Sequence, residues 1–168
     1  MTGAQAAPRI DVVAAALVDD LDNPRHVLAA RRTEPPLLAG GWEFAGGKVD
    51  PGESPEEALH REIGEELGVS IALGENVPGP LAGWWPLGER YRMRVWLATV
   101  RDGIPQPLEG HSELRWLACS AAWSVDWLPS NRPIVQALLD GVWNREEDNH
   151  ANPSRATPQD DPQQQTQE

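Results

Sequence analysis

The stretch 46–69 carries carboxylates at a spacing that could bind a metal ion. It reads GGKVDPGESPEEALHREIGEELGV, and Glu62, Glu65 and Glu66 stand at i, i+3 and i+4. On a helix these three side chains share one face, where like charges repel by roughly 0.2–0.5 kcal/mol per pair. A hard cation such as Mg²⁺ prefers carboxylate oxygens and would relieve this repulsion. The alternative is an ordinary acidic, solvated helix face.

Local signals predict the helix that would carry these glutamates. Ser54 suits the N-cap, Pro55 suits the first helical position, and Glu57 completes an S-x-x-E capping box. Gly68 suits the C-terminal stop, so we expect a helix from about Pro55 to Leu67. Its buried stripe would be formed by Leu59, Ile63 and Leu67. The glutamates then lie beside this stripe rather than opposite it.

The wider spacing from Gly47 to Val69 resembles the Nudix box, G-x5-E-x7-R-E-U-x-E-E-x-G-U with U aliphatic, and every specified position matches. The resemblance implies an α/β fold in which a mixed β-sheet is sandwiched between α-helices. It also implies hydrolysis of a nucleoside diphosphate linked to another group, with Mg²⁺ or Mn²⁺ as cofactor.

The same resemblance implies roles for individual residues. The metal ligands would be Glu62, Glu65, Glu66 and the backbone carbonyl of Gly46. Glu65 would also belong to the catalytic set, Glu53 would support metal binding or the attacking water, and Arg61 would orient the glutamates. The alternative for Arg61 is a plain surface ion pair, which contributes little.

Beyond the box, the chain resembles the MutT-like nucleoside triphosphate pyrophosphohydrolases. The stretches AARR and GWEFAGGKV are typical of that branch. The resemblance implies a nucleotide site lined by Arg32, Glu43, Phe44, Ala45 and Gly46. Lys48 could contact phosphate, although a lone loop lysine is more often solvated.

Two positions bear on the preferred base. Asn131, in LPSNRPIV, matches the MutT asparagine that reads an oxidised guanine, and its amide offers both a donor and an acceptor. Its alternative is an N-cap for the helix that follows. Ala45 stands where Pro is usual, as it does in a CTP-preferring relative. We therefore favour 8-oxo-dGTP, and with it nucleotide-pool sanitation and DNA repair, over CTP, dCTP or a 5-substituted pyrimidine triphosphate.

The general base is harder to place. MutT-like proteins often carry an acidic residue six positions before a strand tryptophan, but counting back from Trp116 gives Gly110. Glu109 is one place earlier, and a one-residue shift is easily absorbed in a glycine-containing loop. Glu109 is therefore the candidate base and Glu113 a weaker one. His111 could reach phosphate.

Two rival functions stay open at this stage. One is hydrolysis of a nucleotide sugar or a dinucleotide. The other is a Nudix-fold module that senses a nucleotide without cleaving it; such modules usually lose box glutamates, and all are present here. Loss of pyrophosphate release in a Glu66→Gln variant would separate enzyme from sensor.

Periodicity predicts one domain over residues 9–143. Strands are expected at 10–18, 26–31, 90–100 and 113–118, with the third alternating as a strand with one wet face does, and a second helix at 133–143. We expect residues 1–8 and the Gln-rich tail 144–168 to be disordered.

Composition narrows the partners. A formal net charge of −12 argues against binding a nucleic acid polymer, although a bound cation could still bring in a small anionic nucleotide. A single cysteine, Cys119, fits a reducing cytoplasm, and no apolar run is long enough for a membrane helix. We expect a monomer or homodimer. Trp84 and Trp85 could stack on a base, plug a sheet edge or bury against a second subunit.

Overall fold

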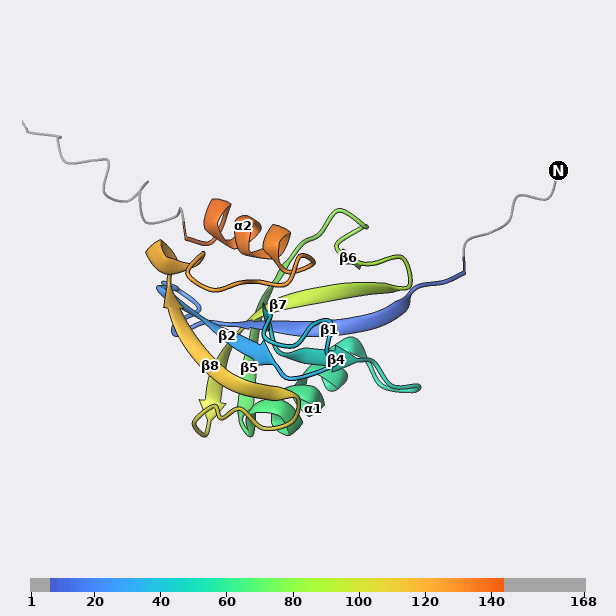
Figure 1. The fold of residues 1–168 in the computed structure, drawn as a ribbon, viewed down its shortest axis with the longest axis horizontal. Coiled ribbons are helices and arrows are strands. Elements are labelled where there is room, and N and C mark those ends of the chain that lie inside the picture. The colour runs from blue at the N-terminus through green and yellow to red at the C-terminus, as the bar shows by residue number, and fades with distance from the viewer. Residues whose placement is uncertain (1–6, 144–168) are drawn as a thin grey trace, which may run out of the picture.

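The sheets lie between two α-helices in the computed structural model, which describes residues 7–143 (Figure 1). The predicted tail at 144–168 and most of the predicted disordered N-terminus lie outside the described residues. The α/β class and the sandwich of sheet between helices are confirmed. No helix within residues 7–143 is long and apolar enough to cross a membrane.

Two sheets carry the strands. The first has the order β4-β1-β7-β5, with β6 beside β7, and the second has the order β3-β2-β8. β1 and β7 run parallel at the centre of the first sheet, and the other pairs are antiparallel. The elements are β1 (Ile10–Leu17), β2 (His26–Arg32), β3 (Trp42–Glu43), β4 (Gly46–Lys48), α1 (Pro55–Leu67), β5 (Ser70–Val77), β6 (Trp85–Leu87), β7 (Tyr91–Asp102), β8 (His111–Ala118) and α2 (Arg132–Asp140).

The central strand β1 serves two hydrophobic cores, one on each face. Alternate side chains of a strand point to opposite faces. Ala14 and Ala16 therefore join the core under α2, whereas Val13, Ala15 and Leu17 join the core under α1. Burial on both faces explains why β1 reads as an almost continuous apolar run.

Helix α1 forms as its local signals predict. The Glu57 N–H donates to Ser54 Oγ at 3.1 Å, and the Ser54 N–H donates to Glu57 Oε2 at 2.7 Å, which completes the capping box. Gly68 ends the helix with φ +70°. The expected stripe of Leu59, Ile63 and Leu67 is fully buried, so the helix presents a fixed orientation to the sheet.

Several elements differ from the expectation. The third predicted strand alternates only in its first residues, because β7 is central and its residues 95–98 are all buried. The second helix ends at Asp140 rather than 143, since Gly141 stops it. The strands β3, β4, β5 and β6 were not predicted.

Strand β4 depends on glycine. A Cβ on Gly46 would collide with the backbone of Val13 and Ala14 in β1. Because β4 lies so close to β1, the loop that follows β4 and leads to α1 starts against the central strand. This contact places the backbone of Gly46 and Gly47 opposite the glutamates of α1.

Candidate active site

Arg61 lies at the centre of a carboxylate cluster along α1. Its Nη2 and Nε atoms donate to both oxygens of Glu53, at 2.6 and 3.1 Å. Its Nη1 lies 2.9 Å from Glu62 Oε1 and 3.4 Å from Glu65 Oε2. Nη2 also donates to the Lys48 carbonyl at 3.1 Å. One guanidinium thus ties the loop before the helix to three of the box glutamates, which is more than a single surface ion pair.

Glu62 is packed against a glycine. A Cβ at residue 47 would overlap the Glu62 carboxylate, which would then have to shift. Burial raises the pKa of Glu62, while Arg61 opposes the shift. Glu65 is exposed by comparison, with 47% of its side chain accessible.

Glu66 is the most perturbed carboxyl of the cluster. Its Oε2 accepts the Gly46 N–H at 3.1 Å. Burial, followed by repulsion from Glu43, raises its pKa to about 8. Repulsion from Glu62 acts in the same direction. The Gly46 amide nitrogen therefore faces Glu66, and the proposed ligand role of the Gly46 carbonyl stays a prediction.

The donor set suits a hard divalent cation. Across residues 7–143, no group of three acidic, His or Cys side chains is already arranged as a metal site, and Arg61 contacts the carboxylates of Glu62 and Glu65. Glu62 and Glu66 nevertheless have raised pKa values and repel each other. Carboxylate oxygens are the ligands that Mg²⁺ and Mn²⁺ prefer, so the residues fit the implied metal.

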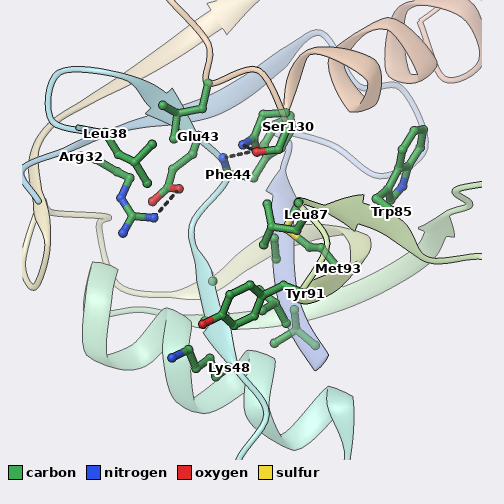
Figure 2. A pocket seen from close by; sticks show the side chains of 18 of the residues that line it. Arg32, Leu38, Glu43, Phe44, Lys48, Trp85, Leu87, Tyr91, Met93 and Ser130 are labelled. Atoms are coloured by element: carbon green, nitrogen blue, oxygen red, sulfur yellow. Dashed lines mark hydrogen bonds and ion pairs between the residues drawn. The ribbon is translucent and has the colours of Figure 1, made fainter. Parts of the chain in front are cut away.

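A cavity of about 1320 Å³ opens beside Glu66 and extends to the start of α2 (Figure 2). Arg32 and Glu43 stand on one side, Leu87 and Met93 on another, and Lys48 lies near the Tyr91 ring next to α1. The predicted residues that line the cavity are Arg32, Glu43, Phe44, Gly46, Lys48, Glu66, Glu109 and Asn131. Three residues of α1, Arg61, Glu62 and Glu65, are not among its lining residues, and neither is Glu53 in the loop before the helix.

Ala45 was expected to line the nucleotide site, but it is not among the residues that line the cavity. Its side chain is buried in the core under α1 and does not line the cavity. The reason is local geometry, because the Ala45 carbonyl accepts the Ala15 N–H at 2.9 Å and holds the residue against β1. Its flanking residues Phe44 and Gly46 do line the cavity.

The Glu43 carboxylate links Arg32 and His111 in the cavity wall. Arg32 Nη1 donates to Glu43 Oε2 at 3.1 Å, and His111 Nε2 lies 3.0 Å from Glu43 Oε1. Glu109, the predicted base, lies at the exposed rim of the same cavity. Gly110, with φ +74°, turns the chain between them, so His111 points inward at the start of β8.

Asn131 occupies the N-cap position of α2 but makes no capping hydrogen bond. Its Oδ1 instead accepts the Phe44 N–H at 3.3 Å, and its Nδ2 donates to Ser130 Oγ at 3.4 Å. The side chain is buried at the cavity wall. The Asn131 side chain therefore does not cap the helix.

Comparison with known proteins decides the family, since a NUDIX domain profile matches residues 9–138. The chain belongs to the Nudix family. An 8-oxo-dGTP diphosphatase of Haemophilus influenzae is 49% identical over 128 residues, covering 71% of this chain and 85% of that protein. A CTP pyrophosphohydrolase of Escherichia coli is 35% identical over 130 residues, covering 77% and 91%. The solution structure of the E. coli ORF135 protein matches with a TM-score of 0.63 at 32% identity, covering 86% of this chain and 95% of that one.

This Nudix chain is a MutT-like pyrophosphohydrolase, as the box and the segments around it predicted. Nudix enzymes act on small nucleotide substrates and generally use divalent cations. Of the box glutamates, Glu66 lines the cavity.

The adjacent tryptophans Trp84 and Trp85 of this Nudix chain have different surroundings. Trp84 is buried, with the guanidinium carbons of Arg92 and Arg94 at 4.1 and 4.4 Å from its ring centroid, and it does not line the cavity. Trp85 does line it, but its Nε1 donates to the Val77 carbonyl at 2.8 Å. Trp85 is thus a fixed part of the cavity wall.

Two cavity residues received no firm role from the sequence. Tyr91 lines the cavity with the Lys48 ammonium 5.5 Å from its ring centroid. His111 is buried between two carboxylates. Counting back from Trp116 for an acidic residue pointed to the loop before His111, but only the turn at Gly110 shows that His111 faces inward.

Proposed function

We propose that this enzyme hydrolyses a nucleoside triphosphate to the monophosphate and pyrophosphate with Mg²⁺ or Mn²⁺, and that 8-oxo-dGTP is the preferred substrate. One observation carries the proposal. A single cavity runs from the Glu66 carboxylate, where a metal and phosphates would sit, to the Asn131 amide, where a base would sit. The setting would be the cytoplasm, where such an enzyme would clean the nucleotide pool.

Glu62, Glu65 and Glu66 would hold the ion, with the Gly46 carbonyl as a further ligand. When bound, the ion would polarise the phosphate oxygens and neutralise the charge that develops on them. Arg61 would keep Glu62 and Glu65 oriented through the contacts that it makes with both carboxylates.

Two carboxylates compete for the role of base. The pKa of Glu53 is lowered, first by its hydrogen bonds from Arg61, and a weakly basic carboxylate is a poor proton acceptor. Glu53 therefore acts by fixing Arg61. Glu109 lines the cavity rim and is exposed, so it is the better candidate to accept a proton from the attacking water.

Lys48 and Arg32 would neutralise the phosphate chain. Both line the cavity, and Lys48 stands next to α1. Arg32 is also tied to Glu43, which holds its guanidinium in place. Phosphate bound between two such cations gains charge-assisted hydrogen bonds.

The base would rest against Phe44 and Asn131. Because the Phe44 N–H and Ser130 Oγ hold the Asn131 amide, its donors and its second oxygen lone pair have a fixed direction. A fixed amide discriminates between base edges better than a mobile one. The similarity to 8-oxo-dGTP diphosphatases supports the choice of an oxidised guanine.

A pyrimidine triphosphate is the second candidate. It is favoured by the CTP pyrophosphohydrolase relative, whose match covers more of both chains. The sequence argument for it rested on Ala45, and Ala45 does not face the cavity. The argument for a pyrimidine from Ala45 is therefore weaker than the argument for an oxidised guanine from Asn131.

A nucleotide screen tests the proposal. Pyrophosphate release with Mg²⁺ is measured for 8-oxo-dGTP, dGTP, CTP, dCTP and ADP-ribose, and the substrates are ranked by kcat/KM. We expect 8-oxo-dGTP to rank first. A higher rank for CTP or dCTP would transfer the proposal to pyrimidines.

Glu66→Gln is the matched variant for the metal site. It keeps the shape of the side chain but removes a charge, so we expect turnover to fall by about two to three orders of magnitude. Glu56→Gln, on the exposed face of the same helix, is the control and should retain activity. Turnover near that of the wild type in Glu66→Gln would refute the proposed ligands.

A further inference from the structure

The imidazole of His111 is buried between two carboxylates that serve different parts of the cavity. Only 2% of its side chain is accessible. Nε2 lies 3.0 Å from Glu43 Oε1, and Nδ1 lies 3.9 Å from Glu66 Oε2. Glu43 faces the Arg32 side of the cavity, whereas Glu66 faces the carboxylate cluster of α1.

The bond to Glu43 fixes one end of the ring. An ionised carboxylate only accepts hydrogen bonds, so Nε2 carries the proton and donates to Oε1. The other Glu43 oxygen accepts from Arg32 Nη1 at 3.1 Å. Both oxygens of Glu43 are therefore engaged, and Arg32 is tied to the ring through it.

The other end of the ring has a buried polar atom without a partner. Nδ1 makes no hydrogen bond within the described residues, and burying such an atom unpaired is unfavourable. Its neighbour is Glu66 Oε2, which the Gly46 N–H holds from the other direction. The gap of 3.9 Å is too long for a hydrogen bond.

We propose that His111 is a positioning residue that couples the substrate-facing Glu43 to the metal-facing Glu66. A small rotation of Glu66 would bring its Oε2 within hydrogen-bond distance of the unpartnered Nδ1. The ring would thus set the position of Arg32 and Glu43 relative to the metal site. This inference rests on the proposed function, because it takes Glu66 as a metal ligand.

Two amide variants separate the two ends of the ring. The amide of Asn reaches about as far as Nδ1 of histidine, and the amide of Gln reaches about as far as Nε2. His111→Asn therefore keeps a polar atom near Glu66 and loses the one near Glu43. His111→Gln does the reverse, and His111→Leu loses both.

The experiment measures the Kd for Mn²⁺ from the electron paramagnetic resonance signal of the free ion, the KM for 8-oxo-dGTP and for CTP, and the thermal unfolding temperature. Partners that orient a metal ligand typically change affinity or activity by about 10–100-fold. We expect His111→Gln to weaken Mn²⁺ binding by about tenfold with little change in KM. His111→Asn should raise KM by about tenfold with little change in Mn²⁺ binding, and His111→Leu should show both losses.

His60→Leu is the control, because His60 is exposed on α1, and it should change neither quantity. If the Asn and Gln variants lose Mn²⁺ and nucleotide affinity in equal measure, in step with their unfolding temperatures, His111 only fills space and the inference is wrong. Unchanged affinities in all three variants would also overturn it. A wild-type protein that binds no Mn²⁺ would instead refute the proposed function itself.

Discussion

Arg61 and Glu66 show how single residues set the state of the metal site. Arg61 contacts Glu62 and Glu65 while it holds both oxygens of Glu53. A cation bound by Glu62 and Glu65 would compete with Arg61 for their oxygens. Glu53, which makes two hydrogen bonds with the guanidinium, would keep Arg61 in place during that exchange.

Glu66 gives a prediction about stability and pH. Its carboxyl pKa is raised from 4.5 to about 8 in the folded protein, so the folded state holds a proton that the unfolded state releases. Without metal, the free energy of unfolding should therefore fall as the pH rises from about 4.5 to about 8. Glu66→Gln removes this titration, so the variant should unfold at a higher temperature than the wild type at pH 8, with a smaller difference at pH 5.

Thermal unfolding in the presence of a chelator checks this prediction. Glu56→Gln, which alters an exposed carboxyl of the same helix, should give the same small difference at both pH values. If the stability of Glu66→Gln followed the wild-type pH profile, Glu66 would not be the buried acid described above. A stabilised but inactive variant would show that this carboxyl serves function at a cost in stability.

At the scale of elements, α1 was predicted closely because its signals are local. The capping box at Ser54, the stop at Gly68 and the apolar stripe all act within a few residues. The strands β3 and β4 have no such signals, because Gly46 belongs to a strand only through its contact with β1. β5 was not predicted since its register shifts between Leu73 and Asn76 break the period of two.

Two substitutions in α1 should change stability in opposite directions. Ser54→Ala removes the N-cap bond and should lower the free energy of unfolding by about 1 kcal/mol. Gly64→Ala should raise it by about 1 kcal/mol, because Gly64 is exposed and a Cβ there meets nothing within 4 Å. Urea denaturation of the metal-free protein measures both. The same sign for both changes would contradict the account of the helix.

The whole molecule brings together residues that the sequence keeps far apart. Glu66 lies at the end of α1 and Asn131 at the start of α2, yet both line one cavity. The family motif predicted the carboxylates, because a metal site on one helix is a local pattern. The positions of His111 and Ala45 could not be predicted, since they depend on how β8 and β4 pair with other strands.

The central claim is that the α1 carboxylates bind a divalent cation and, through it, a nucleotide's phosphate chain. A crystal structure with Mg²⁺ and a non-hydrolysable nucleoside triphosphate analogue tests it most directly. We predict an ion coordinated by Glu62, Glu65 and Glu66, with the phosphates between that ion and Arg32 and the base against Asn131. A bound nucleotide whose phosphates lie away from α1, with the glutamates facing Arg61 or solvent and no ion between them, would contradict the account.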